Sequence, residues 1–196
     1  MNTKQLAMKV NRHYSNSFVL GSALLGKKYE HVLSGFFFEK TRNSIYVYRF
    51  FFPLFDNSTP IHLLFSERIA SIALVEQNFV KKSNTELINN LIDIIELQKE
   101  VFEAVISLED FCSYMESNNG ILSNAHGQLI YAFTNSLLEK HDVAENYLNK
   151  AFPLLHKTKL EICKQALSLL VSSPEELMNF LAMEESSFKL RYLTNQ

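Results

Sequence analysis

Four carboxylates recur at helical spacing in the middle of the chain. Asp93, Glu96, Glu100 and Glu103 are separated by three, four and three residues. Side chains three and four residues apart lie on the same face of a continuous helix. A solvated helix face is the usual explanation of such a pattern, and the alternative is an acidic docking surface for a basic partner.

Arg49 is a second candidate, because it stands in an apolar and aromatic segment. A long charged side chain is costly inside a strand unless it is paired. The sequence favours an ion pair with Glu39 or Glu67. The alternative is a partner-binding arginine set among aromatic rings, with Tyr46 and Tyr48 beside it.

The histidines show no metal-binding spacing. The six of them are scattered and include no pair four residues apart, so spacing predicts no zinc site; they are His13, His31, His62, His126, His141 and His156. His31 and His62 fall at expected strand positions, where they could meet across a sheet. With Glu39 and Glu67 they are the candidates for a catalytic site built from distant residues, although we expect no enzymatic activity.

Two further patterns carry little chemistry. Residues 21–28 (GSALLGKK) approach the phosphate-binding loop but lack its final hydroxyl residue, and a helix is not expected to follow. Cys112 and Cys163 lack the spacing of a metal or redox pair. We expect both to be buried thiols in a reducing compartment, and we expect no cofactor.

The elements that would position these residues change in type along the chain. Residues 32–40, 45–55 and 61–69 are typical of strands, joined by polar turns that are too short for parallel crossovers. Pro53 suggests a bulge or a sheet edge, and residues 17–25 weakly favour a strand. The predicted sheet is therefore an antiparallel meander of three or four strands.

Helices are expected on either side of this meander. A short one should end near Asn11, and a long one should span 85–106. The others are predicted at about 107–117, 124–139, 142–155, 158–171 and 173–192. Ser107 with Asp110, and Ser173 with the following proline, are the expected N-caps. The fold class is α+β: a sheet in the N-terminal third, then a helical C-terminal two-thirds. The expected division is 1–80 and 84–196, packed as one compact unit.

Composition and charge exclude several classes of protein. The chain has 196 residues and is 47% hydrophobic and 20% charged, which is typical of a globular protein. Its net charge of −2 gives no electrostatic attraction to nucleic acid or to an anionic membrane. Residues 1–80 hold 9 Lys and Arg against 5 Asp and Glu, whereas residues 81–196 hold 10 against 16. No apolar run is long enough to span a membrane, and the N-terminus lacks the apolar stretch of a signal peptide, so we expect a cytoplasmic location.

Two segments resemble known kinds of protein. Residues 31–69 (HVLSGFFFEK, YVYRFFFPLF and IHLLFSERI) resemble small uncharacterised bacterial α+β proteins, some of which look like immunity or antitoxin partners of toxins. Residues 125–156 resemble one tetratricopeptide-type helix pair, with Ala132, Ala144, Leu148 and Ala151 at its small and apolar positions. The first resemblance implies a protein partner, and neither transfers a functional residue.

These observations predict a non-enzymatic cytoplasmic protein that binds another protein, with a toxin as the specific expectation. The acidic carboxylates, Arg49, Tyr46 and Tyr48 are its predicted contact residues. One alternative is a small-molecule or lipid-binding module whose pocket is lined by the aromatic sheet. Another is a homodimeric scaffold.

Overall fold

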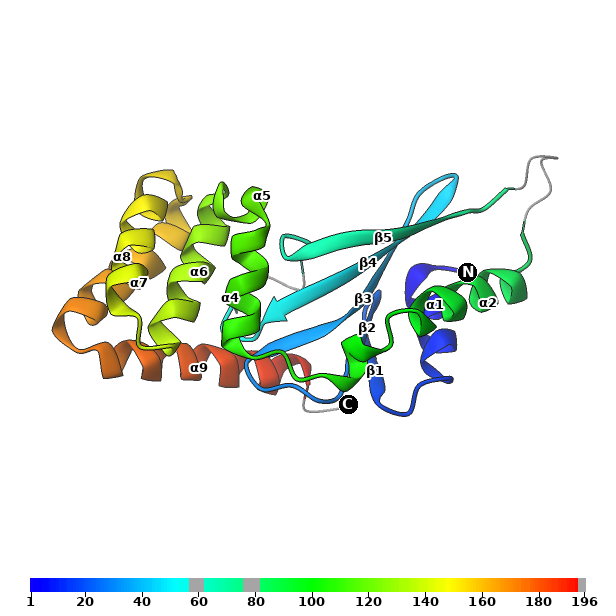
Figure 1. Ribbon diagram of the computed structural model, residues 1–196, viewed down its shortest axis with the longest axis horizontal. Coiled ribbons are helices and arrows are strands. Elements are labelled where there is room, and N and C mark those ends of the chain that lie inside the picture. The colour runs from blue at the N-terminus through cyan, green and yellow to red at the C-terminus, as the bar shows by residue number, and fades with distance from the viewer. Residues whose placement is uncertain (57–61, 76–81, 194–196) are drawn as a thin grey trace. The chain divides into compact units, whose positions relative to one another are not determined.

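The structure is a computed structural model that describes residues 1–56, 62–75 and 82–193 (Figure 1). The chain forms two compact units. Unit 1 comprises Met1–Phe51 and Ser66–Val105, and unit 2 comprises Phe52–Phe65 and Ile106–Asn195. The division expected near Lys81–Asn84 begins at a residue outside the described ranges and stays a prediction.

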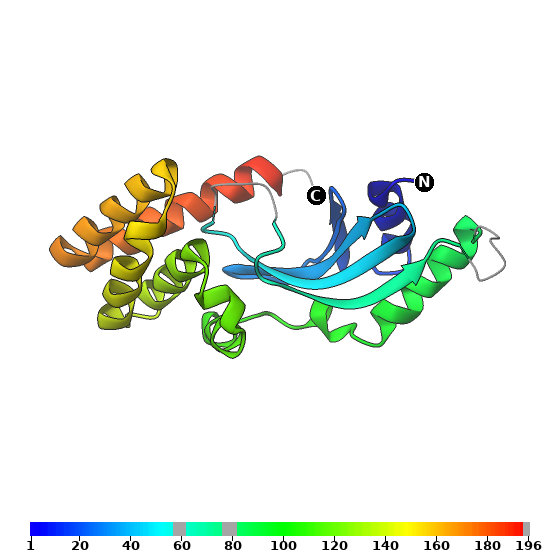
Figure 2. The same cartoon turned by 90° about the horizontal axis from the view of Figure 1, so that it is seen from above.

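Unit 1 is built on an antiparallel sheet. The described residues form five strands in consecutive order, which twist along their length (Figure 2). These strands are β1 (Ser17–Leu20), β2 (Ala23–Gly26), β3 (Val32–Lys40), β4 (Ser44–Pro53) and β5 (Ser66–Ala73). The α+β class is therefore confirmed, but the count of three or four strands is wrong. Residues 17–25 form a hairpin rather than one strand, because Gly21 turns the chain with φ of +61°.

The last two strands differ in detail from the prediction. The third expected strand, at 61–69, begins only at Ser66 and continues to Ala73; Ile61 lies outside the described residues. Pro53 is the final residue of β4, so it ends the strand. The irregularity in pairing with β5 lies instead at Val47 and Tyr48.

Three helices cover one face of this sheet. They are α1 (Thr3–Asn11), α2 (Asn84–Glu96) and α3 (Glu100–Glu103). Their apolar side chains share a core with alternate residues of the strands, since one face of a strand presents every second side chain. This core includes Leu6, Val10, Phe36, Phe38, Ile45, Val47, Leu91, Ile95 and Phe102. The single helix predicted over 85–106 is wrong, because α2 ends at Glu96 and a turn follows before α3.

Unit 2 contains most of the helices. They are α4 (Leu108–Ser117), α5 (Asn119–Leu122), α6 (Ala125–Leu137), α7 (His141–Ala151), the 3-10 helix η1 (Phe152–Leu154), α8 (Lys157–Ser172) and α9 (Pro174–Tyr192). Helices α4, α6, α7, α8 and α9 lie close to the predicted ranges, whereas α5 was not predicted. The α6–α7 pair is the predicted hairpin, and its four small or apolar marker residues are fully buried.

Helix α6 lies between α4 and α7 and is buried on nearly every side (Figure 1). Its polar residues Thr134, Asn135 and Ser136 are buried as well. Each donates a hydrogen bond to the backbone carbonyl four residues earlier, at 2.8–3.0 Å. These bonds satisfy the polar groups, so a helix with polar side chains can occupy the centre of the unit.

The two predicted helix caps of unit 2 differ. Ser107 accepts a hydrogen bond from the backbone N–H of Asp110, and the Asp110 side chain accepts one in return from the Ser107 backbone, which confirms the capping box. Ser173 is the N-cap residue of α9, with Pro174 in the first turn. Its side chain makes no capping hydrogen bond among the described residues; its backbone carbonyl accepts from Glu176 instead.

Candidate functional site

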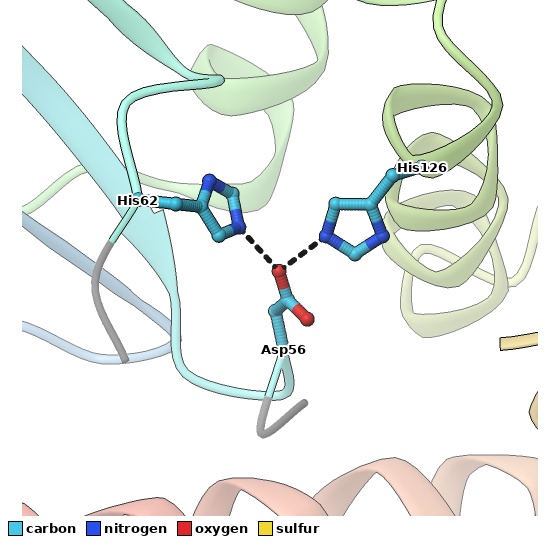
Figure 3. A group of neighbouring side chains, drawn as sticks. All are labelled: Asp56, His62 and His126. Carbon is cyan, nitrogen blue, oxygen red and sulfur yellow. Dashed lines mark hydrogen bonds and ion pairs between the residues drawn. The ribbon is translucent and has the colours of Figure 1, made fainter. Parts of the chain in front are cut away.

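A buried carboxylate in unit 2 has three side chains as partners, and Figure 3 shows two of them, His62 and His126. Asp56 is 3% exposed. Its Oδ2 lies 2.8 Å from Nε2 of His62 and 2.7 Å from Nε2 of His126. Its Oδ1 lies 3.3 Å from Nζ of Lys159. We call this group the Asp56 cluster.

The strand end and the turn after it place Asp56. Leu54 and Phe55 are buried in a turn that follows Pro53, and the backbone N–H of Asp56 donates to the Pro53 carbonyl at 3.0 Å. His62 is held by aromatic contacts, with its ring centroid 5.6 Å from those of Phe52 and Phe65. Asp56 and His62 are therefore held in place by the apolar residues that pack around them.

Two helix N-termini supply the other members. His126 lies in the first turn of α6, where the Asn124 side chain accepts hydrogen bonds from the backbone of His126 and Gly127. Lys159 lies in the first turn of α8. Both side chains are mostly buried, at 19% and 18% exposed. The Asn124 cap thus fixes the start of α6 and with it the position of His126.

The charge state of Asp56 follows from its surroundings. Burial alone would raise the pKa of its carboxyl group, but the hydrogen bonds from His126 and His62 and the charge of Lys159 outweigh that and hold it well below its usual range. Burial lowers the pKa of Lys159, and the nearby Asp56 carboxylate opposes that shift. Asp56 is therefore ionised at neutral pH.

Hydrogen bonding also assigns the proton on His62. The backbone N–H of Leu64 donates to Nδ1 of His62 at 3.3 Å, so Nδ1 is the unprotonated nitrogen and Nε2–H donates to Asp56. In His126, Nδ1 is buried and has no hydrogen-bond partner within the described ranges. Its Nε2 is the nitrogen that faces Asp56.

A small cavity of about 200 Å³ adjoins the cluster. The charged residues that line this cavity are Asp56, Lys159 and Glu184. The rest of its lining is apolar and consists of Phe55, Leu129, Ile130, Phe133, Ile162 and Phe180. Pockets for drug-sized ligands measure about 300–1,000 Å³, so this one suits only a small molecule.

The predicted acidic residues lie in unit 1. Asp93, Glu96, Glu100 and Glu103 are all exposed, but they do not share one continuous helix, since the turn between α2 and α3 separates the pairs. Glu96 lies 3.8 Å from Lys99. Leu97, in the same turn, is 82% exposed.

The predicted residues of the sheet already have partners within unit 1. Arg49 forms the predicted ion pair with Glu67, at 2.9 Å. Tyr48 donates a hydrogen bond to Glu39 at 2.8 Å, and the Arg68 guanidinium lies 5.0 Å from the centre of the Tyr46 ring. All of these side chains lie at or near the surface, and their role in binding a partner stays a prediction.

Other sequence-based expectations are corrected or supported by the elements. His31 precedes β3 and His62 lies outside the strands, so neither occupies the predicted strand position. Residues 21–28 form the turn and second strand of a hairpin rather than a strand, loop and helix, consistent with the rejection of a phosphate-binding loop. Cys112 and Cys163 are free and buried, as predicted.

Sequence reasoning did not find the Asp56 cluster. Asp56 had the character of a turn residue, and Lys159 had no distinguishing neighbour. The separations in sequence between Asp56 and its partners are 6, 70 and 103 residues. No local spacing rule covers such distances. Only the Asp56–His62 proximity in sequence offered a signal, and it is a weak one.

The fold and the cluster define an α+β protein with a buried carboxylate bound by histidines and a lysine. Searches for known relatives found no matching family model, no matching curated protein and no matching solved structure. Within the described residues, none of the helices combines the length and apolar character needed to cross a membrane.

Proposed function

We propose that this chain is a non-enzymatic protein that binds a basic protein partner, in the manner of an immunity-type inhibitor. The contact is made by the acidic segment, defined here as Asp93–Glu103. The observation that carries the proposal is the exposure of Leu97 among the carboxylates of this segment. An exposed apolar side chain in a segment rich in like charge is the kind of feature that a complementary protein surface would bury.

Charge complementarity indicates the chemistry of the partner. The segment holds four carboxylates and one lysine, Lys99, which pairs with Glu96. Its excess of negative charge would steer a basic surface and speed its association. Tyr14 lies near the segment, and burial, the nearby Glu96 and the charge of Asp93 raise the pKa of its hydroxyl group. Tyrosines are frequent at binding hot spots.

The test compares variants rather than relying on capture alone. A partner recovered with the wild-type chain should be purified, and its affinity measured by calorimetry at several salt concentrations. The double variant Glu100→Lys and Glu103→Lys should weaken binding by about tenfold or more, and added salt should weaken wild-type binding. Leu97→Asp should act in the same direction.

The matched control is Glu145→Lys, because Glu145 is an exposed glutamate on α7 of unit 2. It makes the same change of charge outside the acidic segment. If Glu145→Lys weakened binding as much as the reversals at Glu100 and Glu103, the acidic segment would not be the contact surface. Binding that ignored both Leu97→Asp and salt would reject the proposal.

A second candidate function is supported by the cavity beside the Asp56 cluster. Its walls are mostly apolar, and its charged groups are Asp56, Lys159 and Glu184. This combination suits a small ligand with an apolar body and one polar group. The pocket is lined by helical residues and Phe55, not by the aromatic sheet that the sequence suggested.

Native mass spectrometry of the purified chain tests this second candidate. A co-purified small molecule should disappear in Leu129→Trp, which fills the cavity, and persist in Leu97→Ala, which changes an exposed residue of unit 1. An unliganded spectrum for the wild-type chain purified under mild conditions would count against it.

A further inference from the structure

Three potential metal ligands converge in unit 2. The ligand atoms of Asp56, His62 and His126 all lie within 4.8 Å of one another. Both imidazoles present the same ring nitrogen, Nε2, to one carboxylate oxygen (Figure 3). Two histidines and a carboxylate are a common ligand set for zinc and related ions, and they leave a coordination position for water.

The distances permit an ion after a small rearrangement. With bonds of about 2.1 Å in a tetrahedral arrangement, neighbouring ligand atoms are about 3.4 Å apart. The two nitrogen–oxygen distances are 2.8 and 2.7 Å, so the oxygen would move away from each nitrogen. The two nitrogens lie within 4.8 Å of each other, and side-chain rotation can bring them to the same spacing.

The protons of the imidazoles can be accounted for. Coordination through Nε2 requires each neutral ring to carry its proton on Nδ1 instead. In His126 the buried Nδ1 accepts no hydrogen bond among the described residues, so protonation of Nδ1 would break none. In His62 the bond from the Leu64 N–H would be broken; at 3.3 Å it is long, so a metal–nitrogen bond would outweigh it.

We propose that Asp56, His62 and His126 bind one divalent transition-metal ion of the zinc type. The ion joins the segment that contains Asp56 and His62 to the start of α6, and so stabilises unit 2. This site goes beyond the proposed protein-binding function, which lies on unit 1 and needs no metal. Each proposal can therefore fail without the other, because they rest on different residues and different measurements.

Lys159 distinguishes a metal site from an ion-pair network without a metal. Its ammonium group lies 3.3 Å from the other oxygen of Asp56, where it would repel a bound cation. A metal site therefore predicts that Lys159→Gln tightens metal binding. An ion-pair network without a metal predicts the opposite pattern, in which Lys159→Gln only destabilises the fold and no variant binds zinc at this position.

The experiment uses the full chain stripped with a chelator. Calorimetry with zinc chloride should show one ion per chain, and cobalt chloride should give the visible absorption bands of a low-symmetry cobalt site. Magnesium chloride should give neither signal, because magnesium prefers oxygen ligands in octahedral geometry. His126→Gln should weaken zinc binding by about a hundredfold or more.

Matched controls separate the site from general histidine binding. His141→Gln and His156→Gln change histidines at the starts of α7 and α8 in the same unit, outside the cluster. Both should bind zinc as the wild-type chain does. His126→Cys keeps a metal ligand and should shift the cobalt spectrum toward sulfur coordination, which guards against a misfolded glutamine variant.

Two results would overturn the proposal. One is a wild-type chain that binds zinc no more tightly than a correctly folded His126→Gln chain, with no cobalt spectrum. The other is an equal loss of affinity in His141→Gln or His156→Gln, which would place the ion elsewhere. Circular dichroism of every variant establishes that the chains compared are folded.

Discussion

Unit 1 keeps its charged side chains at the surface, whereas unit 2 encloses some of them. Among the described residues, the polar residues of unit 1 that are buried as a whole are Ser17 and Ser34, whose hydroxyls are hydrogen-bonded. Unit 2 buries Asp56 and Glu185 as well. A buried charge is tolerated only with close partners, so the interior of unit 2 depends on specific pairing.

The core of unit 1 is stabilised mainly by the packing of apolar side chains. Its buried side chains are aliphatic and aromatic, and its ion pair between Arg49 and Glu67 is exposed. We therefore expect the loss of one charge to lower the free energy of unfolding more in unit 2 than in unit 1. Four predictions test or refine that contrast.

The largest effect is expected from the loss of the buried carboxylate. Asp56→Asn leaves Lys159 mostly buried without its anion, and should lower the free energy of unfolding by about 3–5 kcal/mol. Glu67→Gln removes one partner of the exposed pair in unit 1 and should cost less than about 1 kcal/mol. Urea unfolding with chelator present measures both; equal losses would erase the contrast between the units.

The next effect concerns close approaches of the backbone, where the units should agree. A Cβ at Gly35 would lie 2.2 Å from the Leu24 carbonyl oxygen, and one at Gly127 would lie 2.1 Å from that of Ile121. Gly35→Ala and Gly127→Ala should each destabilise the chain by about 1–3 kcal/mol, as in other overpacked sites.

The control for this pair is Gly120→Ala in α5. The nearest atom to a Cβ there is Asn118 Oδ1, at 3.5 Å, so the added methyl group fits. Alanine should then stabilise by up to about 1 kcal/mol, through its greater helix propensity. Thermal unfolding ranks the three variants, and a loss at Gly120 as large as at Gly127 would contradict the steric explanation.

A smaller effect is expected at the helix caps. Ser83 caps α2 in unit 1 and Ser107 caps α4 in unit 2, each by accepting a backbone N–H. Replacement of either by alanine should cost about 1 kcal/mol. Ser173→Ala should change stability by only a few tenths of a kcal/mol, because that side chain makes no capping bond in the described structure. Chemical denaturation of the three variants distinguishes them.

The smallest effect concerns thiols, which occur only in unit 2. Burial raises the pKa of the Cys112 and Cys163 thiols to about 11, from the ordinary 9.0. At pH 8 only about one thiol in a thousand is then ionised, so alkylation of the native chain should be slow. Mass spectrometry should find two modified thiols after denaturation and almost none before.

The raised pKa of the two thiols also makes the stability of the fold depend on pH. Between about pH 9 and pH 11 the unfolded thiols lose protons while the folded ones keep them, so the free energy of unfolding should fall as pH rises. Below about pH 8 these thiols should contribute almost no pH dependence, because they are protonated in both states. Rapid native alkylation at pH 8 would show instead that unit 2 opens easily.

Local patterns predicted most of the elements. The apolar spacing of residues 124–192 located α6 to α9 within a few residues, and the turn chemistry around 41–44 separated β3 from β4. The single helix expected over 85–106 failed because the apolar spacing continues from Ile95 to Phe102, although the backbone turns between α2 and α3. Periodicity reports which side chains can be buried, not whether each hydrogen bond along the helix forms.

The Asp56 cluster was beyond local prediction for a different reason. Asp56 at a turn and His126 near a helix start are both residues that suit those positions on their own. Their meeting is a consequence of tertiary packing around α6, with no trace in spacing. By contrast, the Arg49–Glu67 pair was predictable, since neighbouring strands place the two residues opposite each other.

The order in which the chain is synthesised determines when the Asp56 cluster can form. Residues 52–65 belong to unit 2, yet the chain on both sides of them belongs to unit 1. During synthesis from the N-terminus, Asp56 and His62 emerge long before His126 and Lys159, which follow Asp56 by 70 and 103 residues. The carboxylate must therefore remain hydrated while most of the helices are made, and its burial is a late event. A ribosome-bound chain that stops before α8 would still lack the cation that compensates Asp56.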